Sequence, residues 1–265
     1  YYRNSSNLGF VKNCNNAVEN VIDKKGDVLL LNSDTKVTKN FLQEMQRILY
    51  SEEKIGIVNP RSNNATVWSV PMDKRFAFEP KRSYKYWDKL KNHIPEKYIA
   101  PTSHGFCMLI RRDIIEEIGL FDEIFGKGFG EENDFTMRAG RLGWKCAVAN
   151  YAFVYHYESR SFGNKQREKL AAENIKIIRK RYPEYDSNIS AYLESTNENY
   201  NIDSKLWIYY QIIINAINYG HDRGYKTMLK KGAKKLHRKV TRKGKDHKRM
   251  PAIIIWAHEI TYTGA

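Results

Sequence analysis

The sequence is poor in cysteine, which limits the chemistry that thiols can provide. Its three cysteines, Cys14, Cys107 and Cys146, are an odd number, are widely spaced and form no Cys-x-x-Cys pair. This spacing argues against a structural zinc site and against a dithiol redox motif. We expect all three to be small core residues in a reducing compartment.

Long hydrophobic runs are also missing. The longest apolar-rich stretch, residues 206–219, is interrupted by Gln211, Asn215 and Asn218. It is shorter than the roughly 20 residues that a helix needs to cross a bilayer. The sequence therefore predicts no membrane-spanning helix.

Acidic residues are scarce in only one part of the chain. The net charge is +15, but residues 226–250 hold twelve Lys and Arg against the single acid Asp246, which leaves 33 basic and 29 acidic residues elsewhere. Without a basic sheet face, the many Tyr and Phe residues do not indicate a nucleic-acid platform. We expect residues 226–250 to form a basic helix that binds an anionic membrane surface, and a solvated linker helix is the alternative.

Hydrophobic periodicity predicts alternating helices and short buried strands over residues 1–183. Helical spacing of apolar residues predicts a helix over 11–22, and the run Val28–Leu31 is typical of a strand buried on both faces. The other expected elements are a helix capped by Thr38 or Asn40, a strand over 55–58, a helix near 84–91, a strand over 106–110, a short helix capped by Asp113 and ended by Gly119, extended segments at 146–149 and 152–155, and a helix over 165–181. This order predicts a layered α/β domain, and a helical basic segment follows it.

One carboxylate stands just past a predicted strand. Asp34 follows Val28–Leu31 and the polar pair Asn32-Ser33. Ligands of open α/β sheets gather outside the carboxyl ends of strands, so this carboxylate is well placed to hold a metal or a phosphate-bearing ligand. A plain turn is the alternative, because Asn, Ser and Asp all favour turns.

Three carboxylates and a histidine mark two further places. Glu131, Glu132 and Asp134 crowd a loop-to-helix junction, where like charges raise a carboxyl pKa and the helix N-terminus lowers it, as in a tuned general base. Ordinary complements of the helix dipole are the alternative. His156 ends an extended run, where a satisfied structural histidine is the alternative to a metal ligand.

Five sequence pieces, in this order, match a known family in sequence and spacing. They are Asn7-Leu8-Gly9-Phe10 with Asn16, Leu31-Asn32-Ser33-Asp34, Gly119-Leu120-Phe121-Asp122-Glu123, Gly130-Glu131-Glu132-Asn133-Asp134 with Arg138, and Val154-Tyr155-His156 with Ser161-Phe162-Gly163. Together they resemble the family 2 glycosyltransferases of the GT-A fold over about residues 1–183. The resemblance implies a mixed, mainly parallel sheet flanked by helices.

The resemblance also implies a donor site and a metal. In the family, the last Asp of an Asp-x-Asp motif and a downstream His hold a divalent ion that grips the diphosphate of a nucleotide sugar, and these positions are Asp34 and His156 here. Manganese or magnesium suits such ligands. The first Asp of the motif is replaced by Asn32. The donor-binding positions expected on this ground are Asn7, Gly9, Asn16, Asn32 and Asp34.

The family's Glu-Asp pair, whose second member is the catalytic base, falls on Glu131-Glu132, and Asp134 completes the expected catalytic group. The implied reaction is inverting transfer by direct displacement, in which Glu132 takes the proton from an acceptor hydroxyl. The expected acceptor is a glycan or a lipid-linked glycan. Because nucleotide sugars are made in the cytoplasm, we expect a cytoplasmic active site, peripheral on the inner face of the membrane.

A second class of function stays open. In this alternative the chain is a catalytically inactive binding module, which residues 226–250 anchor to an anionic membrane, an acidic polymer or nucleic acid. Metal-dependent turnover of a nucleotide sugar separates the two hypotheses.

The motifs near the two ends of the chain predict that it is part of a longer protein. Asn7-Leu8-Gly9-Phe10 belongs well inside the family's catalytic domain, so residues 1–183 are expected to be a GT-A domain without its opening strands, with little activity alone. Residues 184–250 are the expected helical, basic linker or membrane-facing segment. In 251–265, Ile253–Glu259 with Thr263-Gly264-Ala265 resembles the first strand and glycine turn of a family 4 glycosyltransferase of the GT-B fold. The chain is thus expected to be an internal segment of a longer protein.

Overall fold

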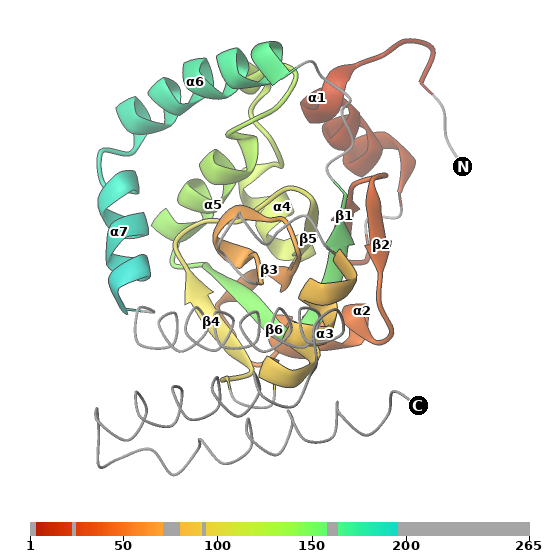
Figure 1. Ribbon diagram of the computed structural model, residues 1–265. Coiled ribbons are helices and arrows are strands. Elements are labelled where there is room, and N and C mark those ends of the chain that lie inside the picture. The colour runs from red at the N-terminus through yellow and green to blue at the C-terminus, as the bar shows by residue number, and fades with distance from the viewer. Residues whose placement is uncertain (1–3, 23–24, 71–79, 92–93, 158–163, 196–265) are drawn as a thin grey trace, which may run out of the picture. The chain divides into compact units, whose positions relative to one another are not determined.

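The computed structural model (Figure 1) describes the chain in five stretches, residues 4–22, 25–70, 80–91, 94–157 and 164–195. All of them belong to one compact unit, Tyr1–Ser204. A second unit, Lys205–Ala265, lies outside the described residues. The basic helix expected at 226–250 and the strand expected at 251–265 fall within that second unit.

A six-stranded mixed sheet forms the centre of the first unit. Its strands are β1 (Val28–Leu31), β2 (Thr35–Val37), β3 (Ile55–Arg61), β4 (Lys97–Ala100), β5 (Cys107–Ile110) and β6 (Lys145–His156). They lie in the order β1-β5-β3-β6-β2, and β4 also pairs with β6. The mixed α/β architecture expected from the sequence is confirmed.

The strand directions add a detail that the sequence did not predict. β1, β3 and β6 run the same way, and β3 pairs with β6 in parallel. β5 is inserted antiparallel between β1 and β3, and both β2 and β4 are antiparallel to β6. The described sheet therefore has more antiparallel pairing than the family resemblance implied. A short apolar run could not reveal this, because a strand covered by helices looks the same in either direction.

β6 joins two expected extended segments into one strand of 12 residues. Its first half lies between β3 and β4, and its last residues pair with β2, where Thr35 stands opposite His156. The sequence suggested a break because Asn150 is polar. In the structure Asn150 is buried, accepts a hydrogen bond from Arg61 and donates one to the Pro95 carbonyl, so the strand continues through it.

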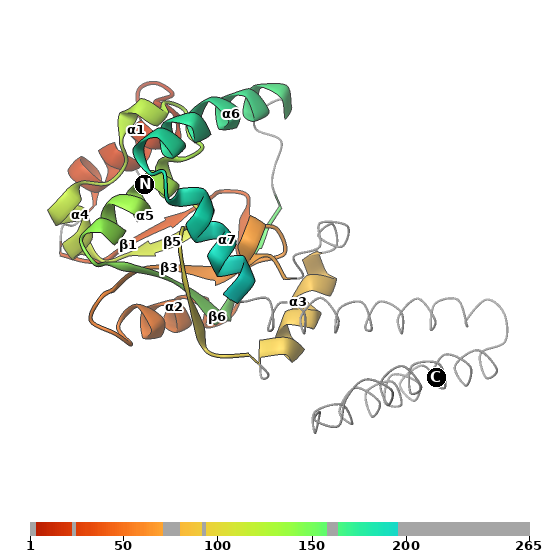
Figure 2. The same cartoon turned by 90° about the vertical axis from the view of Figure 1, so that its left-hand side faces the viewer.

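Helices cover both faces of the sheet (Figure 2). α2 (Phe41–Leu49) packs against β3, β5 and β6 on one face, and α1 (Gly9–Asn16), α4 (Arg112–Ile118) and α5 (Glu131–Arg141) lie on the other. α3 (Pro80–Leu90) contacts β6, and α1 continues as a π turn, Ala17–Val21.

The expected helices and their ends are largely confirmed. α1 with its π turn, α2 after Asn40, α3 and α6 (Asn164–Arg181) correspond to predicted helices. Gly119 ends α4 with a φ of 68°, a conformation that suits glycine. Asp113 does not cap α4, because its carboxylate instead pairs with Arg111 at 2.6 Å.

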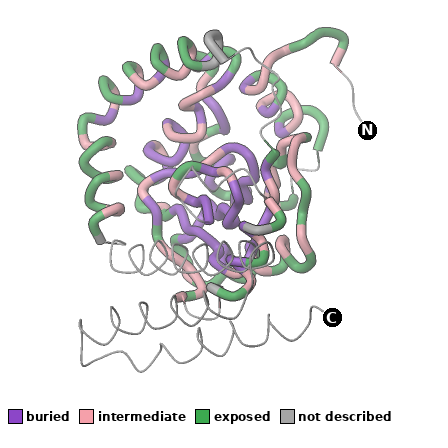
Figure 3. Tube along the Cα trace, in the orientation of Figure 1, coloured by how far each residue is buried: buried purple, intermediate pink, exposed green. Residues whose placement is uncertain are grey.

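The core is built from the sheet and the inner faces of its helices (Figure 3). β1 is less buried than expected, because Leu31 is 42% exposed. The cysteines are buried free thiols, as predicted, and burial raises the pKa of each of them.

The last described helix, α7 (Tyr185–Ser195), extends the compact unit beyond the boundary expected at residue 183. Its Tyr192 ring meets the buried Trp68 edge-on, with 5.8 Å between the ring centroids. Pro183 ends α6 without ending the packed unit. Residues 184–195 therefore belong with the α/β domain.

Gly56 in β3 offers a test of this packing. A Cβ at Gly56 would lie 2.8 Å from the Trp144 ring and would overlap Ile114. Gly56→Ala should therefore lower the free energy of unfolding by about 1–3 kcal/mol, measured by urea titration. Gly140→Ala, on an open stretch of α5, is the control and should cost nothing, because alanine is the better helix former. Equal stabilities of the two variants would contradict this account of the core.

Candidate active site

The expected metal ligands lie together although they are far apart in the sequence. Asp34 follows β1 and immediately precedes β2, and His156 is the last residue of β6. The antiparallel pairing of β2 with β6 brings the His156 Nε2 atom within 3.6 Å of the Asp34 Oδ1 atom. Both side chains are largely enclosed, with exposed fractions of 8% and 16%. The structure thus places a carboxylate and an imidazole nitrogen side by side at a sheet edge.

Two asparagines hold His156 in one orientation. The Asn64 carbonyl lies 2.7 Å from His156 Nδ1 and can only accept, so Nδ1 is the donor of this bond. In the neutral ring the lone pair then belongs to Nε2, the atom that faces Asp34. The Asn63 amide group accepts from the His156 backbone N–H and donates to its carbonyl, at 2.9 and 2.8 Å. A metal-binding histidine usually has a hydrogen-bond partner on the ring nitrogen that does not bind the metal, and the Asn64 backbone carbonyl is such a partner for Nδ1.

Sequence reasoning missed these asparagines and their neighbour Asn59. The Asn59 amide group donates to the carbonyls of His104 and Cys107 and accepts from the His104 N–H, which fixes the loop before β5. The sequence feature that could have revealed these three asparagines is the polar run from Asn59 to Asn64, directly after an apolar strand. Buried amide side chains directly after a strand need backbone hydrogen-bond partners, so they indicate a loop that is held in one conformation.

Glu132, the expected base, lies in the first turn of α5 and keeps partial solvent exposure. Its carboxylate accepts a hydrogen bond from the backbone N–H of Gly130, at 3.2 Å. Burial raises the pKa of Glu132, and the nearby backbone N–H groups of Glu132 itself, Gly130, Gly105 and Asn133 oppose the rise. The group is held in place, yet it is a stronger proton acceptor than an ordinary carboxylate.

The segment 103–106 connects the two halves of the site. The Ser103 hydroxyl donates to the backbone carbonyl of Glu132 at 3.1 Å, and the ring of Phe106 stacks on His156 with 5.1 Å between centroids. The Phe106 carbonyl also accepts from the N–H of Asn32, at 2.9 Å. The first turn of α5, the Asp34 turn and the histidine are therefore all in contact with one four-residue segment.

Glu131 faces a different environment from that of its neighbour. It is 4% exposed, and its Oε2 atom has no hydrogen-bond partner within the described residues. Burial raises its pKa well above the ordinary value, and the charge of Glu132 raises it further. Glu131 in turn adds to the effect of burial in raising the pKa of Cys14 in α1 to about 12. We therefore expect this carboxyl to hold its proton more tightly than an ordinary glutamate.

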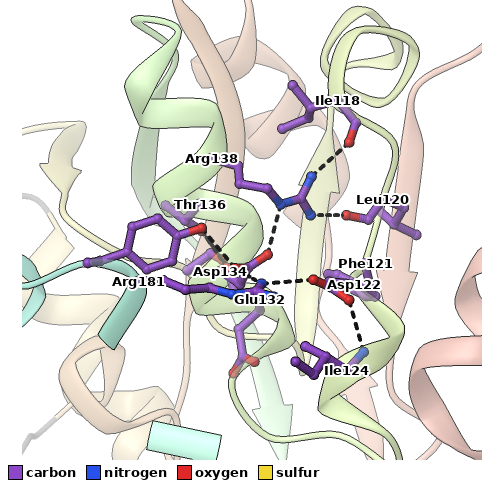
Figure 4. A network of polar contacts seen from close by, with 12 residues as sticks. Ile118, Leu120, Phe121, Asp122, Ile124, Glu132, Asp134, Thr136, Arg138 and Arg181 are labelled. Carbon is purple, nitrogen blue, oxygen red and sulfur yellow. Dashed lines mark hydrogen bonds and ion pairs between the residues drawn. The ribbon is translucent and has the colours of Figure 1, made fainter. Parts of the chain in front are cut away.

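Asp134 has both carboxylate oxygens engaged in a buried network (Figure 4). Its Oδ2 atom accepts from Arg138 at 2.8 Å, and its Oδ1 atom accepts from Arg181 at 2.9 Å and Tyr182 at 2.8 Å. Arg181 also pairs with Asp122, at 2.8 Å. Figure 4 shows the Glu132 side chain pointing away from this network. The geometry favours a structural role for Asp134, in contrast to the catalytic role expected from the sequence.

Of the other expected donor residues, Asn7 precedes α1, and Gly9 and Asn16 are the first and last residues of that helix. The Asn7 side chain accepts from the Gly9 N–H at 2.9 Å, and a Cβ at Gly9 would lie 3.5 Å from the Lys127 backbone. Asn16 instead bonds the side chains of Asn4 and Asn20. None of these three contacts reaches Asp34 or His156.

The loop before α5 is itself fixed by α6. Asn174 is buried and donates to the carbonyls of Phe125, Gly128 and Phe129, at 3.2, 2.9 and 2.8 Å. This side chain was not singled out in the sequence, because one asparagine inside a helix carries no distinctive pattern.

A divalent metal would find two protein ligands here. Within the part of the chain that the structure describes, no group of three or more His, Cys, Asp or Glu side chains is placed to hold a metal. The Asp34 carboxylate and the free Nε2 of His156 are suitable donors, and further oxygens would have to come from a bound diphosphate or water. The same residues contain no helix long and apolar enough to cross a membrane.

The burial of Glu131 predicts a pH effect on stability. Because its folded-state pKa lies above the unfolded value, its ionisation opposes folding, and stability is lost as the pH rises from the ordinary carboxyl range through the raised pKa. Glu131→Gln should therefore be more stable than the parent near pH 8, by about 1–3 kcal/mol, with a gap that narrows toward pH 4.5. Thermal melts across this range measure the gap. The exposed Glu116→Gln is the control, and parallel pH profiles for Glu131→Gln and the parent would contradict the assignment.

Comparisons with known proteins bear on the family of the chain. The chain is 33% identical over 70 residues to N-acetylglucosaminyl-diphospho-decaprenol L-rhamnosyltransferase from two strains of Mycobacterium tuberculosis, over 26% of this chain and 22% of each relative. The chain thus matches only about a fifth of the length of these curated relatives. The model of the family described as "Glycosyltransferase like family 2" matches residues 2–173. The match ends before 251–265, where the family 4 domain stays a prediction. With its mixed α/β fold and the motifs in family order, the chain belongs to the family 2 glycosyltransferases.

Proposed function

We propose that this chain carries the catalytic site of a metal-dependent, inverting glycosyltransferase that moves a sugar from a nucleotide-sugar donor to a glycan or lipid-linked acceptor. The observation that supports this most directly is the 3.6 Å contact of Asp34 with His156, joined to Glu132 through the segment 103–106. Glycosyl transfer in general follows from the family. The metal, the stereochemical course and the acceptor are the proposal.

Manganese or magnesium would be held by the Asp34 carboxylate and by Nε2 of His156. When bound, the ion would neutralise negative charge on the diphosphate leaving group. Asn64 contributes by fixing the imidazole so that its free nitrogen faces Asp34. Asn32, at the start of the same turn, would lie beside the donor, and Asn7, Gly9 and Asn16 are proposed donor contacts on the strength of the family motif alone.

Glu132 would act as the general base. Its raised pKa makes it a better proton acceptor, its partial exposure lets an acceptor hydroxyl approach, and the backbone N–H of Gly130 helps to fix its orientation. The carboxylate would remove the hydroxyl proton as the acceptor oxygen attacks the anomeric carbon, and the bond from that carbon to the diphosphate breaks. Glu131 and Asp134 would position the first turn of α5.

The acceptor is proposed from the comparison. The relatives' name describes a rhamnosyltransferase acting on a diphospho-decaprenol acceptor, so a lipid-linked acceptor is the first to test. Because nucleotide sugars are cytoplasmic, the site is proposed to face the cytoplasm. Membrane attachment through residues 226–250 stays a proposal of its own.

The metal assignment is tested with Asp34→Asn and His156→Ala. Both variants should lose manganese-dependent donor binding while keeping the fold, because each removes one of the two protein ligands. Calorimetry with a panel of nucleotide sugars, with and without manganese, measures the change. Asp113→Asn is the matched control, since it makes the same substitution at an exposed carboxylate in α4. Unchanged donor affinity in both site variants would overturn the assignment.

The base assignment is tested with Glu132→Gln. The amide oxygen can still accept from Gly130, so donor binding should persist while turnover falls by roughly a hundredfold or more. In the parent, turnover should rise with pH as the carboxyl of raised pKa ionises, and the variant should lose this rise. Glu131→Gln should cost less, and the exposed Glu116→Gln should cost nothing. A reversed ranking of Glu131→Gln and Glu132→Gln would transfer the role. Nucleotide release that is absent from the parent in every donor would favour the binding-module hypothesis instead.

A further inference from the structure

Three tyrosine rings form a stack that the proposed chemistry does not use. Tyr155 and Tyr157 come from the end of β6 and its continuation, and Tyr84 comes from α3, which contacts β6. The Tyr84 and Tyr155 centroids are 5.7 Å apart at 28°, and those of Tyr155 and Tyr157 are 6.2 Å apart at 16°. We call these three residues the tyrosine platform. Its outermost ring, Tyr157, is 54% exposed.

The hydroxyl groups of the tyrosine platform have no hydrogen-bond partner among the described residues, and the phenols of Tyr84 and Tyr157 add to burial in raising the pKa of Tyr155. By contrast, the exposed Tyr50 donates its hydroxyl to Asp27 at 2.6 Å. A phenol can both donate and accept. Because the three rings stack on one another, the flat apolar surface that the tyrosine platform offers to a ligand is the exposed ring of Tyr157.

Buried rings make the platform rigid. Phe153 meets Tyr84 and Tyr155 edge-on, at 5.5 and 5.2 Å, and Trp87 packs on Phe153 and donates its indole N–H to the Asn150 carbonyl at 2.8 Å. A ligand that binds here would not have to order these rings first. Preorganisation of this kind reduces the entropic cost of binding.

The tyrosine platform adjoins the candidate active site without being part of it. The backbone N–H of Tyr157 donates to the Asp34 carbonyl at 3.0 Å. Consecutive residues of a strand project to opposite faces, so Tyr155 and Tyr157 project away from the face that carries His156. A ligand on the tyrosine platform therefore lies next to the donor end of the site and not at the reacting atoms. Lys36, opposite Tyr155 in the pairing of β2 with β6, adds an exposed polar group.

We propose that the tyrosine platform is a subsite for the acceptor glycan and holds a pyranose ring other than the one that receives the transferred sugar. A pyranose presents a flat face of C–H groups ringed by hydroxyls, which matches the exposed ring of Tyr157 at the end of the stack. A purely apolar chain would leave the three hydroxyls without partners, at a cost for each one that is buried. This inference rests on the proposed function, because it assumes that the acceptor is a glycan.

The test measures oligosaccharide binding by the full chain without donor. The probes are chitotetraose, cellotetraose and maltotetraose, followed by saturation-transfer NMR and by titration of tyrosine fluorescence. At least one probe should bind, and Tyr157→Ala should weaken it by at least about fivefold, the scale of losing one important aromatic contact. Tyr157→Phe, which keeps the ring, should lose less. Tyr50→Ala removes an exposed ring elsewhere and should bind like the parent.

Several outcomes would overturn the inference. They are no binding of any probe, equal affinity of the parent and Tyr157→Ala, equal losses in Tyr157→Ala and Tyr50→Ala, or release of the bound probe by a free nucleotide. A parent that releases nucleotide from a donor but binds no probe loses the subsite and keeps the proposed function. A parent that binds a probe through Tyr157 but turns over no donor keeps a glycan subsite and loses the proposed transfer reaction.

Discussion

The charge of Asp134 is the constraint on which the candidate site depends. Its side chain is fully buried, and an ionised carboxylate in that position is tolerated only with partners. Those partners, Arg138, Arg181 and Tyr182, come from α5 itself and from the end of α6 and the residue that follows it. Removing a partner from a buried carboxylate is destabilising, so the network fixes α6 against the first turn of α5.

This network holds the turn after α4 against the first turn of α5. Arg138 donates to the carbonyls of Ile118 and Leu120, and Arg181 pairs with Asp122, so the turn after α4 is bound to the same carboxylate. Asn174 fixes the loop before α5 from the other side. The first turn of α5 is therefore held at both ends, and Glu132 projects from a fixed position. Asp134, which the sequence suggested as a catalytic residue, is better explained as the residue that holds the first turn of α5, from which Glu132 projects.

Sequence patterns singled out the candidate site residues but not the residues that hold them in place. It placed Asp34 past a strand and His156 at the end of another, and the structure brings them together through β2. That strand has only three residues, Thr35–Val37, and it reads as part of a turn because its apolar pattern is too short to recognise. Asn63 and Asn64 were missed for another reason. Their roles depend on backbone groups of His156 and on a ring orientation that local pattern does not encode.

The position of β1 has a consequence for handling the protein. Among the described strands β1 pairs only with β5, so its other side presents backbone N–H and C=O groups. Leu31 is 42% exposed on this strand, and Val21 and Ile22 are exposed shortly before it. An open strand edge with apolar neighbours is a template for strand addition. A lysine in place of Leu31 is the kind of change by which natural edge strands avoid such pairing.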